Sequence, residues 1–387
     1  MKSKRSLRDF SSASERREFL EKKLDIKLDN IGSFSFTEDS VSGRNIENLI
    51  GATQIPLGVA GPITLHTTNY KLLTTYIPLA TTEGALVASA SRGCKAITES
   101  GGATVNVEVV GTTRGPVFKT KGIEESQKII SWLKSHTSLL AIEAKKTSSH
   151  LRLLKIETAC VGRNLFTRFY FDTSDAMGMN MATIAATHMA RVIEQRTKAE
   201  CISVAGNFDI DKKPAYLNFI LGRGKKVWAE VILKKEVIRD ILKSTPEKMA
   251  EVVYRKILVG SAMSGSLGFN AHYANSVAAI FAACGQDLAH VVEGSLGITT
   301  AEVLKKGDLY FSIYLPSLMI GTVGGGTYLP TQQEALKIMG VKGNGDSLKL
   351  AEIIGSAILA LEISLIASQA EGSLAKAHIN LGRKGGK

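Results

Sequence analysis

The 387-residue chain carries two kinds of hydrophobic pattern, which predict helices and strands in different segments. Apolar residues spaced between charges predict a short amphipathic helix within residues 1–30 that docks on the body of the protein. Thr81 and Thr82 precede a helical pattern over 83–100 that ends at Gly101. This fits the preference of threonine for helix starts and of glycine for helix ends.

Residues 116–203 predict a small unit of mixed helices and strands. Helical patterns cover 123–135 and 181–198. Strand patterns cover 139–144, 151–159, 165–171 and 201–204. Because the spacing suits antiparallel pairing, we expect an α+β module inserted into a larger, mainly helical domain.

The remaining segments belong to that larger domain. A turn-rich stretch covers 41–62, and strand patterns cover 105–118 and 225–235. Helical patterns cover 246–256, 274–292 and 348–377. The apolar run 353–370 is interrupted by Glu362 and is shorter than the ~20 residues of a membrane span, so it predicts a buried helix. The expected parts are an N-terminal helical segment (1–45), a large domain (46–115 and 204–387) and the inserted module (116–203).

Composition limits the classes of partner. The chain has 48 Lys and Arg against 36 Asp and Glu, a net charge of +12, which favours anionic ligands. The basic residues are spread along the chain without interleaved aromatic residues, so we expect neither a nucleic-acid nor a membrane partner. The 4 cysteines are far apart and no His/Cys set has zinc spacing, so we expect no metal site. The N-terminus lacks an apolar run, which predicts a cytoplasmic protein.

Two glycine-bearing loops are candidates for phosphate binding, although the G-x-G-x-x-G motif of many nicotinamide enzymes is absent. The loop 175–180 lies between a predicted strand and a predicted helix. Amides near Gly178 would therefore stand at a helix N-terminus, where a phosphate is favoured. A purely structural turn would give the same pattern. The second loop is 321–326.

Two carboxylates carry candidate acid–base chemistry. Glu83 is expected in the first turn of its helix among small residues, where poor solvation would favour the protonated, proton-donating form. The ordinary alternative is a carboxylate that interacts with the helix dipole. Asp287 is expected on the apolar face of the helix over 274–292, and a buried carboxylate requires a cation nearby.

Two adjacent lysines and one histidine complete the candidate set. Lys212 and Lys213 precede Pro214, which would hold them in place, although adjacent lysines are ordinarily solvated. A fixed ammonium group suits an oxyanion. His378 follows the long C-terminal apolar segment. An isolated histidine is more often structural, but it would also suit protonation of a thiolate leaving group.

These residues lie in runs that resemble a known family, the 3-hydroxy-3-methylglutaryl-coenzyme A reductases, and within it the class I, archaeal-like, soluble type. The similarity extends from Glu47 to Arg383. The matching runs are ENLIG (47–51), LGVAGPI (57–63), ATTEGALVAS (80–89), RGCKAI (92–97), DAMGMNM (175–181), DKKP (211–214), NAHYAN (270–275), ACGQD (283–287) and GTVGGGT (321–327).

The resemblance implies reduction of hydroxymethylglutaryl-CoA to mevalonate and coenzyme A with two NADPH, by a protein whose inserted cofactor-binding module is ferredoxin-like. Lys212 would stabilise the oxyanion and Glu83 would donate a proton to the aldehyde-level intermediate. Asp287 would bridge these two residues. His378 would protonate the departing thiolate. The site would lie across the interface of a homodimer or dimer of dimers, with Lys212 from one subunit and Glu83 and Asp287 from its neighbour.

The resemblance also implies binding residues. The hydroxymethylglutaryl contacts would be Arg114, Lys213 and Asn275. The coenzyme A contacts would be Ser89, Arg92 and Lys256. The cofactor contacts would be Ser148, Asp175, Met177, Gly178, Met179 and Asn180.

Two departures from the family pattern and two alternatives qualify this prediction. Ser149 stands where relatives often have a phosphate-binding arginine, so NADH stays open beside NADPH, with Lys145, Lys146 or Arg152 as substitute charges. Ala205 replaces a substrate-contacting serine. One alternative is a degradative relative that runs the reverse reaction with NADH. The other is a basic binding protein, which the net charge alone favours.

Overall fold

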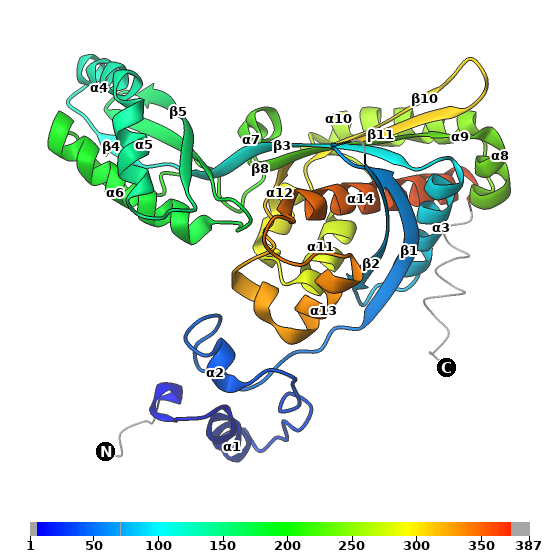
Figure 1. Ribbon diagram of the computed structural model, residues 1–387, viewed down its shortest axis with the longest axis horizontal. Coiled ribbons are helices and arrows are strands. Elements are labelled where there is room, and N and C mark those ends of the chain that lie inside the picture. Colours follow the sequence, from blue (N-terminus) through cyan, green and yellow to red (C-terminus); the bar gives the residue numbers. More distant parts are fainter. Residues whose placement is uncertain (1–5, 70, 373–387) are drawn as a thin grey trace.

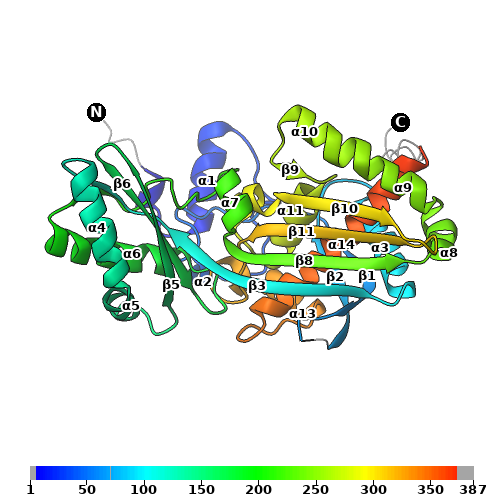
Figure 2. The same ribbon diagram turned by 90° about the horizontal axis from the view of Figure 1, so that it is seen from above.

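The computed structural model describes residues 6–69 and 71–372, which form two lobes and an N-terminal segment (Figure 1). The lobes have separate hydrophobic cores. A continuous set of paired strands joins them, as the view from above shows (Figure 2). The predicted mixture of helices and strands is therefore confirmed.

The large lobe contains a twisted sheet in the order β2-β1-β3-β8-β11-β10-β9. Its strands are β1 (Leu57–His66), β2 (Leu72–Ala80), β3 (Ala103–Arg114), β8 (Gly224–Leu233), β9 (Gly268–Phe269), β10 (Gly297–Val303) and β11 (Leu309–Leu318). Helical residues outnumber strand residues in this lobe, as expected, but the expectation of a mainly helical domain did not include this large sheet. Gly58, Gly61 and Pro62 predicted turns, but all three lie within β1. Gly58 pairs regularly with Leu79 of β2, and Gly61 and Pro62 lie where the register of the two strands shifts between Ala60 and Ile63.

One face of the large-lobe sheet is largely open, as the view from above shows (Figure 2), and Trp228 and Ile232 of β8 are 38% and 51% exposed there. The helices of this lobe pack mainly on the other face. They are α3 (Leu86–Glu99), α7 (Tyr216–Leu221), α8 (Lys235–Val237), η2 (Ile238–Leu242), α9 (Pro246–Val252), η3 (Val253–Gly260), α10 (Ser261–Ser264), α11 (Tyr273–Cys284), η4 (Leu288–His290), α12 (Val291–Gly294), η5 (Gly325–Tyr328), α13 (Pro330–Ile338) and α14 (Ser347–Ala370). In Figure 1, α14 runs between the sheet and the layer of α11 and α13.

α14 is the central helix of the large lobe. It is long and apolar enough to cross a membrane, but 94% of its apolar window is buried inside the protein, which confirms the predicted core helix. Glu362 on this helix is fully buried and has hydrogen-bond partners in two other segments. Glu362 accepts hydrogen bonds from the amides of Ala271 and His272 and from the hydroxyl of Thr299. These bonds satisfy the free amides at the start of α11 and fix the position of that helix.

The small lobe has the element order β4 (Val117–Lys119), α4 (Ile123–Ser135), α5 (Thr137–Lys145), β5 (Arg152–Val161), β6 (Asn164–Asp172), α6 (Met179–Thr197) and β7 (Glu200–Ser203). Its antiparallel strands lie in the order β7-β4-β6-β5. The predicted strand over 139–144 is wrong, because this segment is α5. Leu140 and Ala144, four residues apart, both face the core, and a short apolar run does not distinguish helix from strand.

β3 connects the two lobes. Residues Thr104–Gly111 pair with β8 in the large lobe, and Thr112–Arg114 pair with β6 in the small lobe. The C-terminal end of β3 therefore lies at the junction of the lobes, and it carries Arg114 there.

The N-terminal segment comprises η1 (Leu7–Asp9), α1 (Ala13–Leu24) and α2 (Glu38–Val41) and lies below the large lobe in Figure 1. The predicted helix is confirmed, but its docking differs from our expectation. α1 contacts the rest of this segment through Arg16, which pairs with Glu38 and donates to the carbonyl of Leu49. Leu24 at the end of α1 stays 55% exposed.

Candidate active site

Lys212 and Asp287 form an ion pair in which Nζ lies 2.8 Å from Oδ2. Lys212 belongs to the loop before α7 and has φ = 56°, a left-handed conformation that is uncommon for residues other than glycine. Burial raises the pKa of Asp287, but hydrogen bonds from Lys212 and the amide of Ala289 and the charge of His290 outweigh it, so the pKa lies below its ordinary value. The predicted cation beside Asp287 is therefore confirmed.

The position of Asp287 itself differs from the prediction. α11 ends at Cys284, because Gly285 adopts φ = 69° and terminates the helix. Asp287 then caps η4, and its side chain is 33% exposed instead of buried. Both partners of the ion pair also belong to one chain. The expectation that Lys212 and Asp287 come from different subunits concerns an assembled dimer, which a single chain does not test, so it stays a prediction.

The ion pair lies on the wall of a cavity of about 650 Å³ between the lobes. Glycine-bearing loops form much of this wall: 176–181, 285–288 and 321–327. The loops touch through their backbones. The amide of Thr322 donates to the carbonyl of Asp175 at 2.8 Å, and the side chain of Gln286 makes hydrogen bonds with both backbone groups of Gly321.

Two glycines make this close approach possible. A Cβ on Gly285 would lie 2.3 Å from the carbonyl oxygen of Gly326, so no side chain fits there. Gly178 has φ = 85° and directly precedes α6. A Cβ at this position would lie 2.3 Å from the side chain of Thr173, so no side chain fits there either. The predicted position of Gly178 at a helix N-terminus is confirmed. Gly178, Met179 and Asn180 line the cavity, and the free amides of a helix N-terminus suit an anionic group.

A chain of ion pairs runs behind Lys212. Arg114 lies 2.9 Å from Asp209 and 3.6 Å from Asp211, and Asp211 lies 3.0 Å from Arg223. Arg223 also pairs with Glu293, and both side chains are fully buried. Sequence reasoning missed Arg223 and Glu293. The sequence did contain one signal for Glu293: Asp287, His290 and Glu293 are spaced three residues apart, which would place them on one side of a helical turn.

Asp211, His290 and Glu293 bring potential ligand atoms within 4.8 Å of one another, an arrangement that could hold a metal ion. Arg223 already donates to two of these three side chains. A metal ion would have to displace its guanidinium group, so the cluster suits an ion-pair network better than a metal site.

Glu83 and Asn275 form a second group of predicted site residues. The amide nitrogen of Asn275 donates to the carboxylate of Glu83 at 2.8 Å. Glu83 is exposed and precedes α3, which begins at Leu86, so the expectation of a poorly solvated residue in the first helical turn was wrong for a single chain. Asn275 lies in the first turn of α11, whereas Asp287 follows its other end.

The predicted coenzyme A residues converge on the C-terminal part of α14. Ser89 donates to Ser364 at 2.9 Å, and Arg92 contacts Ser364 and Ser368. Lys256 donates to Gln369 at 2.8 Å. Burial lowers the pKa of both Arg92 and Lys256. His378 would follow this cluster along the chain, but it lies outside the described residues.

The predicted cofactor residues divide into two sets. Met177, Gly178, Met179 and Asn180 line the cavity. The carboxylate of Asp175 instead accepts hydrogen bonds from the amides of Gly345 and Ser347. It therefore fixes the loop to the start of α14. Ser148 lies outside the cavity and donates to the sulfur of Met181 at 3.5 Å.

A shallow pocket of about 500 Å³ lies on the small lobe beside Ser148. Its polar lining comprises Lys145, Ser149, His150, Arg152, Asp172 and Ser174. Arg152 pairs with Asp172 at 3.2 Å, and Lys146 pairs with Glu143 at 2.6 Å. Of the substitute cations expected for Ser149, Lys145 and Arg152 line this pocket.

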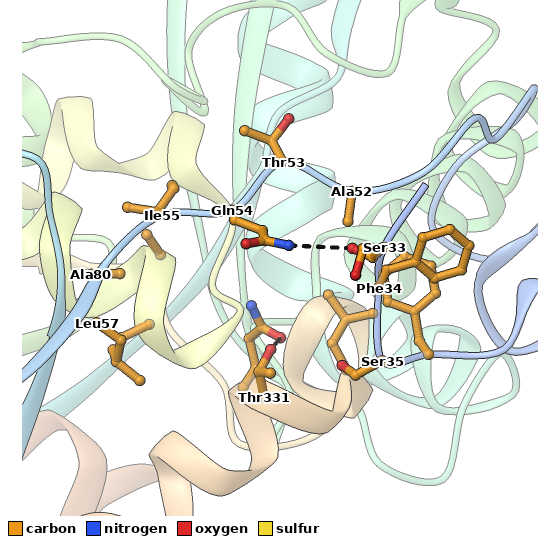
Figure 3. A pocket seen from close by; sticks show the side chains of 15 residues that line it. Ser33, Phe34, Ser35, Ala52, Thr53, Gln54, Ile55, Leu57, Ala80 and Thr331 are labelled. Carbon is orange, nitrogen blue, oxygen red and sulfur yellow. Dashed lines mark hydrogen bonds between the residues drawn. The ribbon is translucent and has the colours of Figure 1, made fainter. Parts of the chain in front are cut away.

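Another pocket, of about 670 Å³, adjoins the cavity (Figure 3). The two spaces share the wall residues Ile55, Ala282, Leu329 and Gln332. Segments 33–36 and 52–55 of the N-terminal region form one side, where Gln54 donates to the carbonyl of Ser33 at 3.3 Å. Ala80 stands on the other side, just ahead of Glu83 in sequence.

An ion-paired lysine that faces a cavity lined by glycine loops and a helix N-terminus defines an enzyme that acts on anionic ligands between two lobes. Comparison with known proteins specifies the family. The model of the hydroxymethylglutaryl-coenzyme A reductase family matches residues 12–383. The chain belongs to this family.

Individual relatives agree with this assignment. The 3-hydroxy-3-methylglutaryl-coenzyme A reductase of Pyrococcus abyssi is 51% identical over 375 residues, which cover 95% of this chain and 92% of the relative. That of Methanocaldococcus jannaschii is 50% identical over 374 residues, which cover 95% of this chain and 92% of the relative. The 3-hydroxy-3-methylglutaryl-coenzyme A reductase 1 of Dictyostelium discoideum is 42% identical over 392 residues, which cover 97% of this chain and 70% of the relative.

The fold is also similar to that of a solved structure. The class II 3-hydroxy-3-methylglutaryl-CoA reductase from Streptococcus pneumoniae, bound to NADPH in open conformations, superposes with a TM-score of 0.69. The match covers 93% of this chain and 97% of the other, at 19% sequence identity. This identity supports a shared fold and no closer relationship.

Proposed function

We propose that the chain reduces hydroxymethylglutaryl-CoA to mevalonate and free coenzyme A. The observation that carries the proposal is the Lys212–Asp287 ion pair on the wall of the glycine-lined cavity. A protonated lysine beside an ionised carboxylate can stabilise the negative oxygen that develops as a thioester carbonyl accepts hydride. NADPH supplies that hydride when it is bound. The free amides at the start of α6 and the adjoining glycine loops suit its phosphates.

Each predicted catalytic residue has a separate role in this proposal. Lys212 polarises the carbonyl oxygen, and Asp287 keeps Lys212 charged and oriented. Glu83 protonates the aldehyde-level intermediate. His378 protonates the coenzyme A thiolate. Arg114 and Lys213 hold the free carboxylate of the substrate, and the cluster of Ser89, Arg92 and Lys256 at α14 holds coenzyme A.

We further propose that a complete site needs two copies of the chain, as a dimer or dimer of dimers. α11 has 12 residues and is therefore roughly 18 Å long, and it separates Glu83 and Asn275 from Lys212 and Asp287. A neighbour related by twofold symmetry would bring its Glu83 to the ion pair. Ile55 and Leu57, beside the second pocket, are 44% and 49% exposed, which fits a surface covered by another subunit.

The finer assignments also belong to the proposal. The order β4-α4-α5-β5-β6-α6-β7 and the antiparallel strand order β7-β4-β6-β5 support a ferredoxin-like cofactor domain at 116–203, inserted between 46–115 and 204–387. The solved structure of similar fold is class II, which argues against class I. The relatives named above are 42–51% identical to this chain, against 19% for that structure, and class I stays a prediction. The burial of α14 supports a cytoplasmic protein.

One assay tests the proposed reaction and the choice of cofactor. The purified protein is mixed with hydroxymethylglutaryl-CoA and either NADPH or NADH, and the loss of nicotinamide absorbance is followed while mevalonate and coenzyme A are quantified. We expect two NADPH to be oxidised for each coenzyme A released. A marked preference for NADH would favour the degradative relative, and no oxidation of either cofactor would refute the reductase assignment.

A further inference from the structure

A fully buried histidine stands directly behind the Lys212–Asp287 pair. His290 has no exposed side-chain surface, although histidine is polar and titratable. Its Nδ1 lies 2.8 Å from Oε1 of Glu293, and its Nε2 lies 3.6 Å from Oδ2 of Asp287 and 4.0 Å from Oδ1 of Asp211. Among residues 6–69 and 71–372, Nε2 of His290 has no hydrogen-bond partner.

The surrounding groups determine which ring nitrogens carry protons. Glu293 is ionised, because it pairs with the guanidinium group of Arg223. Its oxygen therefore accepts a hydrogen bond from the Nδ1–H group of His290. Without a second proton, the lone pair on Nε2 would face the carboxylates of Asp287 and Asp211. This contact is repulsive in a buried site, whereas an N–H group there is attracted to both carboxylates.

The carboxylates around His290 belong to a connected set of ion pairs. Asp287 pairs with Lys212, and Asp211 and Glu293 pair with Arg223. Asp287 and Asp211 are the two whose oxygens lie nearest to Nε2 of His290. Glu293 also accepts a hydrogen bond from the backbone amide of Lys212, at 3.4 Å, so the same cluster contacts both partners of the ion pair.

We propose that His290 is a positioning residue of the reduction. As a buried imidazolium held by Glu293, it keeps the carboxylate of Asp287 ionised and oriented, and through Asp287 it aims the ammonium group of Lys212 at the substrate carbonyl. The inference rests on the proposed reductase function. It adds a residue that acts through Asp287 without contacting the substrate.

Substitutions separate the two ring nitrogens. His290→Asn retains a donor near the Nδ1 position, towards Glu293, and loses the one that faces Asp287. His290→Gln retains a neutral donor near the Nε2 position. We expect His290→Asn to lower kcat by about 10- to 100-fold, since misplacement of a catalytic group has effects of this size, and to change each KM less than about twofold. The decrease in kcat should be smaller in His290→Gln than in His290→Asn. Glu293→Gln, which removes the carboxylate that holds His290, should resemble His290→Asn.

The pH profile gives a readout that a purely structural role would not change. The charged groups that face His290 are Asp211, Asp287 and Glu293, together with Arg223, whose Nη1 lies 3.5 Å from Nδ1 of His290. Removal of the imidazolium should raise the pKa of Asp287, because a nearby positive charge is lost. The acid limb of kcat, which requires ionised Asp287, should therefore move to higher pH in His290→Asn. His188→Asn removes another His–Glu contact, with Glu143 at 2.8 Å in the small lobe, and should leave kcat and its pH profile unchanged.

Nitrogen-15 NMR of the histidine-labelled protein tests the protonation state without an activity assay. The signals of His290 are assigned by their loss in His290→Asn. We expect both ring nitrogens to be protonated at pH 7. An unprotonated Nε2 overturns the proposal, as does a His290→Asn enzyme whose acid limb stays in place. If the wild-type protein does not reduce the thioester at all, the proposed function fails, and the NMR result still decides the state of His290.

Discussion

Glu83 and Lys212 contact opposite ends of the same helix. Glu83 bonds to Asn275 in the first turn of α11, and Lys212 bonds to Asp287 just beyond its last turn. Because the 12 residues of α11, roughly 18 Å, lie between these two contacts, we expect the two groups to act on one substrate carbon only across a subunit interface. The arrangement leads to a prediction about how the site is shared between subunits.

Co-expression of Glu83→Gln and Lys212→Ala chains should restore activity that neither variant has alone. In a mixed dimer, one site receives both substitutions and the other receives none. Random pairing should therefore recover about a quarter of the wild-type kcat. The matched control combines Lys212→Ala with Asp287→Asn. Both of its sites lack one partner of the ion pair, so it should stay inactive. Equal recovery in both mixtures, or in neither, would contradict the shared site.

Lys212→Ala should abolish turnover and leave the fold intact. Loss of one oxyanion-stabilising donor lowers kcat by about 10²–10³-fold, and this lysine is the central one of the proposed site. Its side chain is 42% exposed, so its removal should leave the melting temperature close to that of the wild type. Lys305→Ala, at the exposed turn between β10 and β11, is the control for loss of a lysine. Substantial turnover in Lys212→Ala would remove this residue from the mechanism.

Lys225 should make stability increase with pH in the alkaline range. This lysine on β8 is 6% exposed, and burial lowers its pKa to about 8, although Asp175 and Asp172 oppose the shift. Between that value and the ~10.4 of an unfolded lysine, the unfolded chain binds the additional proton. The free energy of unfolding should therefore rise from pH 8 to about 10.

Denaturant titrations at several pH values measure this rise. Lys225→Met has no group to titrate there and should lose the Lys225 contribution to the rise. Lys226→Met, which alters the neighbouring half-buried lysine, should retain it. An equal pH dependence in wild type and Lys225→Met would show that Lys225 keeps an ordinary pKa.

Ser149→Arg should strengthen the preference for NADPH over NADH. Ser149 lines the pocket of the small lobe with Lys145 and Arg152, and an added guanidinium group can pair with a phosphate there. One such charge-assisted bond predicts an increase of about tenfold in the ratio of kcat/KM for the two cofactors. Ser131→Arg, on the exposed face of α4, should leave the ratio unchanged. An unchanged ratio in Ser149→Arg would place the phosphate elsewhere.

The sequence alone determined local structure wherever one pattern dominated. The helix over 123–135 matches α4, because its apolar spacing and first-turn acids agree with one another. The turn at 175–180 and the helix after it were also predictable, because a glycine directly before a helical pattern is typical of a turn that leads into a helix. A cation beside Asp287 followed from chemistry, since a buried carboxylate requires one, whereas Lys212 as the particular partner followed from the family resemblance.

Only the tertiary structure decided the rest. α11 stops at Cys284 and not near Val292, because Gly285 packs against the backbone of Gly326, a contact distant in the sequence. Glu293 and Arg223 became partners because the sheet and the segment after Asp287 bury them together, and no local pattern encodes that pairing. Local periodicity determines which elements form. The meeting of charged groups depends on long-range packing, which a single sequence does not reveal.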